Sequence, residues 1–203
     1  MLNKKIVLND RQKDALKEIA NICAGNAATS LSQLLKKTIE MNVPCVHLLP
    51  IEEVPKAVGG AETLVVSIIL QVLGDAPGII LLLFPQQDAR TLAGILTGKK
   101  VENGILTEMD QSALKEAGSI LSASYLNTLS TVTKMSLVPS TPGILVDMAG
   151  ALIDYVLIEL STITEYALLI DSIFVDQEKS VKGHFFLLPN PGSLEAILKA
   201  IGE

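Results

Sequence analysis

The sequence contains two related halves, and this repeat constrains the fold more than any other feature. The tetrapeptide Ala-Leu-Lys-Glu at residues 15–18 occurs again at residues 113–116, 98 positions later. The same spacing relates three further identical pairs, which are Ile22 and Ile120, Leu31 and Leu129, and Pro44 and Pro142. So long a period indicates a duplicated unit and not a solenoid. We therefore expect a single domain, residues 1–203, built of two repeats at about 1–103 and 104–203.

Each half begins with a pattern typical of a long amphipathic helix. Asn9 with Gln12, and Thr107 with Asp110 in the second half, have the spacing of residues that cap a helix start. Apolar residues at helical spacing predict the buried face of the first helix, and they are Leu16, Ile19, Ala20, Cys23, Ala27, Leu31 and Leu34. The opposite face, at 100° per residue, carries Asp14, Glu18, Asn21 and Gly25.

The remainder of each half has the pattern of strands followed by a shorter helix. In the first half we predict strands at 45–49, 63–73 and 78–84, a turn at 74–78 and a helix at 87–97. In the second half we predict strands near 136–138, 155–170 and 182–188, with 143–154 as an insertion that forms a short extra helix. This order predicts an α/β fold of the α+β type, in which a duplicated pseudo-two-fold unit packs long helices on a shared, mainly antiparallel sheet.

Composition excludes several classes of function. The formal net charge of −6 argues against nucleic-acid binding, because no basic surface is available for phosphate contacts. Two cysteines and two histidines without ligand spacing predict no metal site; Cys23 is interpreted as a small buried residue, and His47 and His184 as ordinary strand residues. The apolar runs are too short to span a bilayer, and no signal peptide is evident. We expect a cytoplasmic protein without membrane insertion.

The exposed face of the first helix carries a carboxylate and a carboxamide. Glu18 and Asn21 are three residues apart, so both side chains leave the helix on the same side. The arrangement Asp14-x3-Glu18-x2-Asn21, with Pro44 after 22 intervening residues, resembles the signature of the CheC/CheX/FliY phosphatase family. The stretch 21–29 and the duplicated layout over the entire chain strengthen the resemblance. The length, the two motif copies and the lack of a C-terminal flagellar-switch domain favour the CheC type of chemotaxis phosphatase.

This resemblance implies a phosphatase that acts on the phospho-aspartate of a CheY-type response regulator. In that reaction Asn21 would orient the attacking water, and Glu18 would pair with the regulator's active-site lysine. No cofactor of the chain's own is implied, and Mg²⁺ is expected in the regulator, because phosphoryl transfer depends mainly on positioning and charge neutralisation. Helix composition alone would favour a solvated polar face for these two residues. The repeat, the proline spacing and the resemblance favour a site.

Three supporting residues have alternatives that the sequence leaves open. Asp14 either orients Lys17 or Glu18, or simply faces water. Gly25 lies inside the predicted helix, where glycine costs about 1 kcal/mol relative to alanine; it either leaves room for a partner's backbone or allows close helix packing. Pro44 is interpreted as structural, because proline favours an extended chain before the following strand.

The second half departs from the motif at one position. Ser112, Glu116 and Pro142 match the pattern, whereas Ser119 stands where asparagine is expected. A serine hydroxyl is shorter than a carboxamide and cannot reach as far. The second site is therefore predicted to be degenerate, with turnover at the first.

A second protein partner, a CheD-type receptor deamidase, is also implied by the resemblance. The segment 145–154, bounded by Asp147 and Asp154, is the docking helix that the resemblance suggests; an ordinary buried connector is the alternative. Two other functions remain open. One is a non-catalytic adaptor that binds phosphorylated regulator or regulates the deamidase, and the other is a flagellar-switch component.

Overall fold

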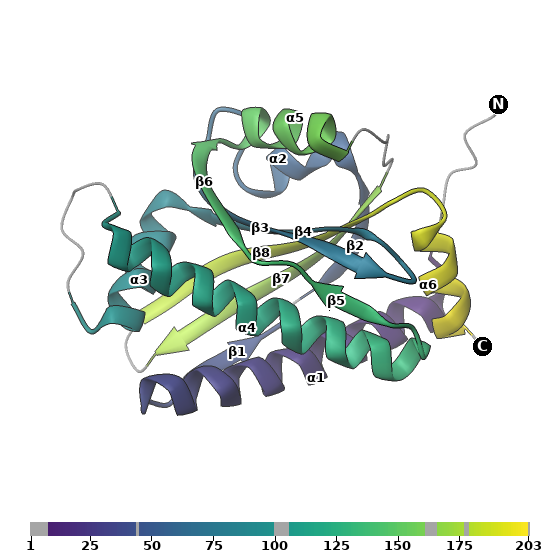
Figure 1. The fold of residues 1–203 in the computed structure, drawn as a ribbon, viewed down its shortest axis with the longest axis horizontal. Coiled ribbons are helices and arrows are strands. Elements are labelled where there is room, and N and C mark those ends of the chain that lie inside the picture. Colours follow the sequence, from purple (N-terminus) through teal and green to yellow (C-terminus); the bar gives the residue numbers. More distant parts are fainter. Residues whose placement is uncertain (1–7, 44, 100–105, 161–165, 177–178, 203) are drawn as a thin grey trace.

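A computed structural model describes residues 8–43, 45–99, 106–160, 166–176 and 179–202, arranged in three layers (Figure 1). The helices are α1 (Asp10–Leu35), α2 (Val54–Ala57), α3 (Gln86–Thr97), α4 (Glu108–Thr133), α5 (Ala149–Leu160) and α6 (Ser193–Gly202), with a 3₁₀ turn η1 (Ile51–Glu53). The strands are β1 (Glu40–Asn42), β2 (Val46–Pro50), β3 (Leu64–Gly74), β4 (Gly78–Pro85), β5 (Leu137–Pro139), β6 (Gly143–Met148), β7 (Tyr166–Asp176) and β8 (Lys179–Pro189). One face of the sheet carries α1, α3, α4 and α6, and the other carries α2 and α5.

The eight-stranded sheet is built around two long hairpins. Its order is β1-β7-β8-β4-β3-β5, β2 also pairs with β7 and β6 with β3, and every described pair is antiparallel. The hairpins β3–β4 and β7–β8 meet where β4 pairs with β8 at the centre. The outer edge of each hairpin is covered by strands from the other half of the chain. The predicted shared antiparallel sheet with long helices packed on it is confirmed.

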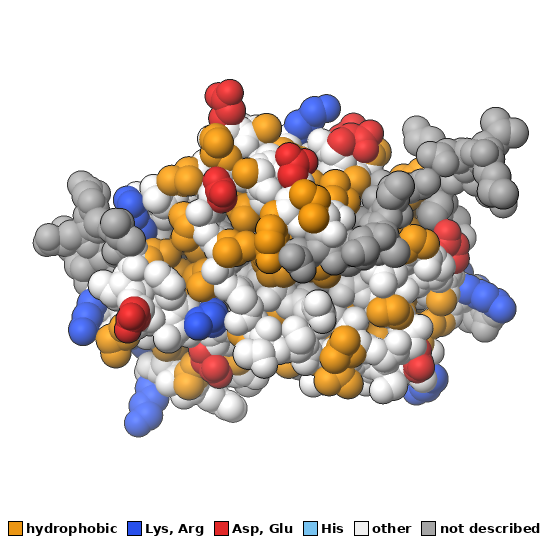
Figure 2. All heavy atoms as spheres, turned by 45° about the horizontal axis from the view of Figure 1, so that its top comes forward, with side chains coloured by type: hydrophobic (Ala, Val, Ile, Leu, Met, Phe, Trp, Pro, Cys, Tyr) orange, Lys and Arg blue, Asp and Glu red, His pale blue; other side chains and the backbone are white. Residues whose placement is uncertain are grey.

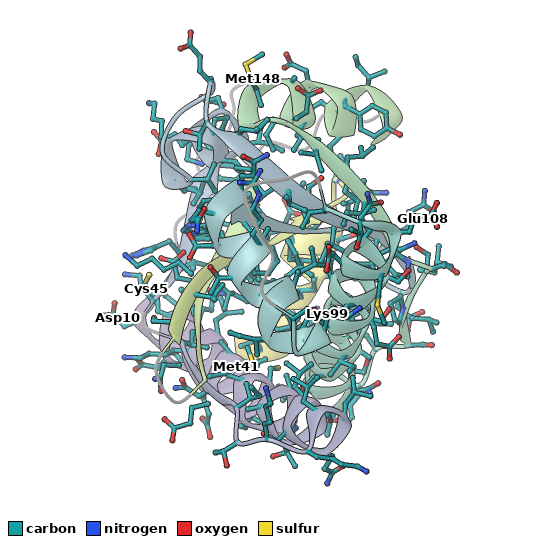
Figure 3. The ribbon with its side chains drawn as sticks, turned by 90° about the vertical axis from the view of Figure 1, so that its left-hand side faces the viewer. Asp10, Met41, Cys45, Lys99, Glu108 and Met148 are labelled. Atoms are coloured by element: carbon teal, nitrogen blue, oxygen red, sulfur yellow. The ribbon has the colours of Figure 1, made fainter. Side chains whose placement is uncertain are left out.

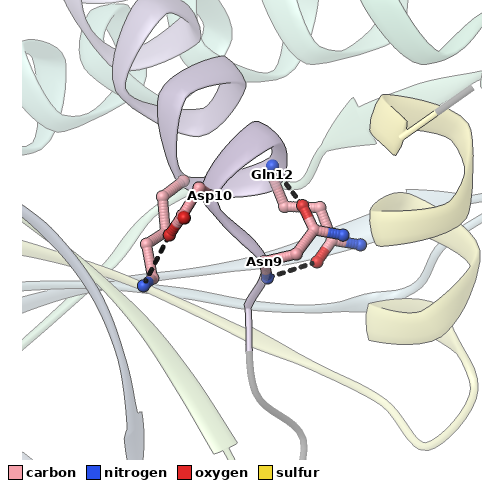
Figure 4. A network of polar contacts seen from close by, with 4 residues as sticks. Asn9, Asp10 and Gln12 are labelled. Atoms are coloured by element: carbon pink, nitrogen blue, oxygen red, sulfur yellow. Dashed lines mark hydrogen bonds and ion pairs between the residues drawn. The ribbon is translucent and has the colours of Figure 1, made fainter.

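The two long helices begin as the sequence predicts. The Asn9 side chain accepts a hydrogen bond from the Gln12 backbone N–H at 2.8 Å, and Gln12 Oε1 accepts one from the Asn9 N–H at 3.1 Å (Figure 4). Thr107 and Asp110 form the same reciprocal pair at the start of α4. These bonds satisfy backbone donors that a helix start leaves unpaired. Both 26-residue helices are therefore fixed at their first turns.

The predicted buried face of α1 is confirmed except at its end. The first six apolar residues of the predicted face are buried in the core between α1, α4 and the sheet. The prediction is wrong for Leu34, which is 54% exposed; Leu35 makes the core contact in that last turn. Cys23 is buried as expected. Near the helix midpoints Ser124 Oγ donates to the Cys23 carbonyl at 2.9 Å, which ties α4 to α1.

Two predictions for the second half are wrong in part. The short helix predicted within 143–154 is present only from residue 149, where α5 begins, because residues 143–148 form strand β6 on the outer edge of β3. The strand predicted at 155–170 is helical over its first six residues, because α5 runs to Leu160. Ala149, Leu152, Ile153 and Val156 recur at helical spacing and are buried in the smaller core against the sheet. The apolar run was therefore a helix face, and β7 begins only at Tyr166.

The order of elements falls into two similar series, each with a long helix, two short edge strands, a hairpin and a closing helix. In both, helical turns lie between the edge strands and the hairpin: η1 and α2 in the first, α5 in the second. The division into repeats near residue 103 stays a prediction, because residues 100–105 lie outside the described part of the chain.

Both histidines and Cys45 lie on the sheet face that carries α2 and α5. Cys45 Sγ donates to Asp171 Oδ2 at 2.9 Å, and His184 Nδ1 lies 2.6 Å from Asp171 Oδ1. The hydrogen bond with His184 lowers the pKa of Asp171 below its ordinary value. Burial, and then the Asp171 carboxylate, raise the pKa of the Cys45 thiol to about 11. The cluster thus disfavours the Cys45 thiolate.

We predict that alkylation of Cys45 by iodoacetamide is slow at pH 8 and accelerates about tenfold per pH unit up to pH 10, because only the thiolate reacts. Asp171→Asn removes the carboxylate that opposes ionisation, so Cys45 should react faster at pH 8. Mass spectrometry of the labelled peptides measures both rates. Cys23, whose burial raises its pKa to about 11 without Asp171, is the internal control. Equal Cys45 rates in the two proteins would show that burial alone sets its pKa.

Candidate active site

The outer face of α1 presents Asp14, Glu18 and Asn21 to solvent, as predicted. Within the described residues none of the three makes a side-chain hydrogen bond or an ion pair. Asp14 therefore orients neither Lys17 nor Glu18 in the free protein, and the alternative in which it faces water is the one observed. The carboxylate and the carboxamide are both available to a partner.

The back of α1 holds this face in place. The helix is anchored to the sheet and α4 by its buried residues, and Gln12 Nε2 donates to the Leu198 carbonyl of α6 at 3.2 Å. Asn21 is exposed although its neighbour Ala20 is buried, so its side chain leaves the helix outside the buried face. Side chains on a rigid, packed helix keep their positions better than side chains on a loop. The site is thus preorganised by the core behind it.

The structure gives no support to one of the two explanations of Gly25. A Cβ built on Gly25 would meet no atom within 4 Å outside its own helix. Close packing within the described chain therefore does not require glycine there. Gly118 on α4 differs, because a Cβ there would lie 2.8 Å from Ile68 Cγ2 in the core. Pro44, the remaining supporting residue, lies outside the described residues.

Ile22 is an exposed apolar residue that the motif does not include. Its side chain is 46% exposed, and it lies one turn after Glu18, about 40° around the helix. A helical projection of the sequence places it among the polar residues of the outer face. An isoleucine on a polar face has no core contact to explain it, so the sequence pattern could have indicated Ile22 as part of the site. The candidate site therefore includes an apolar surface beside Glu18 and Asn21.

The equivalent face of α4 is less accessible. Ser112 and Glu116 are exposed, but Ser119 is half-buried, as is Ile120. Both α1 and the shorter α3 pack against α4, and Figure 3 shows α3 beside α4, with Lys99 and Glu108 near their ends. Pro142, just before β6, is half-buried. Position 119 thus combines a shorter side chain with reduced exposure.

The described residues contain neither a cluster of metal-ligating side chains nor a helix that could span a membrane. No group of three or more His, Cys, Asp and Glu side chains among them is placed to hold a metal ion. In the same residues, no helix combines the length and apolar character needed to cross a bilayer.

Comparison with known proteins places the site in a family context. A profile of the CheC-like family matches residues 12–48, which include most of α1, β1 and the start of β2. The CheY-P phosphatase CheC of Bacillus subtilis is 38% identical over 200 residues, 96% of each chain. The flagellar motor switch phosphatase FliY of the same organism is 30% identical over 139 residues, 68% of this chain and 36% of that protein.

Solved structures show the same fold at lower identity. Thermotoga maritima FliY superposes with a TM-score of 0.76 at 20% identity, over 97% of this chain and 98% of that one. A CheX–CheY–BeF3–Mg²⁺ complex from Borrelia burgdorferi matches with a TM-score of 0.50 at 17% identity, over 83% of this chain and 96% of that one. These likenesses extend the comparison from residues 12–48 to the whole architecture.

Proposed function

The chain belongs to the CheC-like family, and on this basis we propose that it dephosphorylates the phospho-aspartate of a CheY-type response regulator through Asn21 and Glu18. The observation that supports this site most directly is the exposed, unpaired carboxylate and carboxamide on one rigid helix face. Both residues fall within the segment that matches the family profile. The chain is thus a protein aspartyl-phosphate phosphatase.

Asn21 supplies positioning in this reaction and does not supply a base. Its amide oxygen accepts a hydrogen bond from water and its NH₂ group donates, but a carboxamide does not take up a proton. The water oxygen bonds to phosphorus while the bond between phosphorus and the aspartate oxygen breaks, which releases phosphate and restores the carboxylate. A loose transition state needs little help from a base, so an oriented water is enough. One such amide is worth about 10²–10³ in rate.

Glu18 anchors the complex by pairing with a lysine of the regulator. On an exposed surface an ion pair contributes only about 0–1 kcal/mol, but the same pair gains strength when an interface excludes water. Its loss should therefore act mainly on KM. Mg²⁺ belongs to the regulator in this scheme, where it neutralises charge on the phosphoryl group. Such a partner also places the protein in the cytoplasm.

The second half serves structure and partner binding in this proposal. Ser119 offers a short hydroxyl at a half-buried position, so it cannot repeat the role of Asn21. A non-catalytic adaptor is the competing function. It would bind phosphorylated regulator without accelerating phosphate release, so a turnover assay separates the two.

We predict that Asn21→Ala lowers the rate of phosphate release from a phosphorylated regulator by about 10²-fold or more, because the water loses its positioning group. Glu18→Ala should mainly raise KM, and Glu116→Ala should change turnover less than about threefold, within the ordinary effect of losing one exposed contact. Steady-state assays at several regulator concentrations measure these values, with circular dichroism to verify folding. An Asn21→Ala protein with most of its activity would overturn the assigned site.

We also propose that the β6–α5 surface docks a CheD-type deamidase. Figure 2 shows apolar side chains beside acidic ones over this part of the molecule. The exposed apolar residues are Leu145, Val146, Met148, Tyr155 and Ile158, the last 76% exposed. Asp147 on β6 and Asp154 on α5 are exposed among them. Since this surface is not covered by the described chain, an ordinary buried connector explains only the inner side of α5.

We predict that Asp147→Lys and Asp154→Lys each weaken capture of a CheD-type deamidase by about tenfold, because each reverses a charge at the proposed contact. Neither should change dephosphorylation of the regulator, since α1 lies on the other face of the sheet. Glu195→Lys on α6 is the matched control, because it reverses an exposed charge away from this surface. Undiminished capture by both aspartate variants would reject this docking surface.

A further inference from the structure

Gly25 has no reason to be glycine within the described chain. It lies inside α1 without a positive φ, so no unusual backbone conformation requires it. A Cβ there would meet open space. Glycine is among the least favourable residues inside a helix, so alanine would stabilise this position. The described residues of this chain therefore do not explain the glycine, and a partner protein is the source to test.

The other long helix shows what a structural glycine looks like. At the repeat period of 98 residues, Gly118 on α4 corresponds to Ala20 on α1, and Ala123 on α4 corresponds to Gly25. Gly118 is needed for packing, since a Cβ would press into Ile68 and Leu82. Ala123 shows that the fold accepts a methyl group at the position equivalent to Gly25. Glycine at 25 is thus specific to the helix that carries Asn21.

The neighbours of Gly25 make the surface beyond Asn21 flat. The side chains that would project one turn after Asn21 are those at 24 and 25, and they are a buried alanine and a glycine. One turn further, Thr29 Oγ1 donates back to the Gly25 carbonyl at 2.9 Å, which keeps the threonine side chain close to the helix. Ile22, 46% exposed, borders this surface on one side. A partner can therefore come into contact with the helix backbone itself.

We propose that Gly25 is the contact position at which a backbone segment of the phosphorylated regulator lies directly on α1, with Ile22 as its apolar neighbour. This inference rests on the proposed function. Asn21 is a short side chain, so its amide reaches an acyl phosphate only if the protein around that phosphate approaches the helix closely. Gly25 lies one turn, about 6 Å along the axis, from Asn21. A side chain at 25 would hold the regulator away and separate the amide from the phosphoryl group.

The test is a size series at one position, Gly25→Ala and Gly25→Leu, with phosphate release and stability measured on the full chain. We expect Gly25→Ala to raise the urea midpoint and yet lower kcat/KM about 5-fold, and Gly25→Leu to lower kcat/KM by about 100-fold, the range for overfilling a packed contact. Binding of regulator activated with beryllofluoride should weaken in the same order. Higher stability with lower activity is a result that a purely structural role would not produce.

Two matched variants separate the contact from general effects on the helix. Ser30→Leu places the same leucine side chain at an exposed position on another side of α1, and it should leave kcat/KM unchanged. Gly118→Ala should lower the urea midpoint without weakening regulator binding by the folded protein, because its methyl group enters the core. A Gly25→Ala protein that loses stability would assign Gly25 to the fold and overturn the inference.

Failure of this inference is distinguishable from failure of the proposed function. If Asn21→Ala is inactive and Gly25→Leu keeps the wild-type kcat/KM, the site stands and the contact at Gly25 is rejected. If Asn21→Ala keeps its activity, the site itself is rejected, whatever the Gly25 variants show. Loss in Gly25→Leu together with unchanged Ser30→Leu supports the contact.

Discussion

The pairing of β4 with β8 is the constraint on which the rest of the structure depends. Residues 79–84 of β4 are buried on both faces of the sheet, so this strand is stable only with a helical layer on each side. The pairing also joins the two hairpins, and each hairpin takes its edge strands from the other half. Neither half can complete its sheet without the other. The positions of α1 and α4 follow from this arrangement, because both must cover the same face.

Covering that face gives α1 its value as a platform. The apolar residues on its back are buried in the larger core, while the polar residues of the motif extend from the front. The free energy that fixes Asn21 therefore comes mainly from apolar burial behind its helix, and not from hydrogen bonds made by its own amide. This leaves the amide and carboxylate unpaired and available. The related helix α4 is flanked by α1 and α3. Its outer face is less accessible and its motif is altered at one position, so α4 mainly supports the fold.

Local patterns predicted what local physics determines. The capping pairs, the buried face of α1 before its last turn, and the β3–β4 hairpin depend on residues close in sequence, and the structure has them. The exchange of edge strands was not predictable, because a strand's pattern does not say which strand it will pair with. The error at 155–160 has a related cause, since a continuous apolar run suits a strand or a helix, and only burial against the sheet decided for α5.

The candidate site divides in the same way between pattern and geometry. Helical spacing placed Glu18 and Asn21 on one face, and the family resemblance supplied their roles. The structure was needed to interpret Gly25, because a glycine inside a helix has the same unfavourable propensity whether its missing Cβ would meet the core or open space. Gly118 and Gly25 look alike in sequence and differ only in what surrounds them. A residue that is unfavourable in a helix and that the described fold does not need indicates a partner that comes close to the helix.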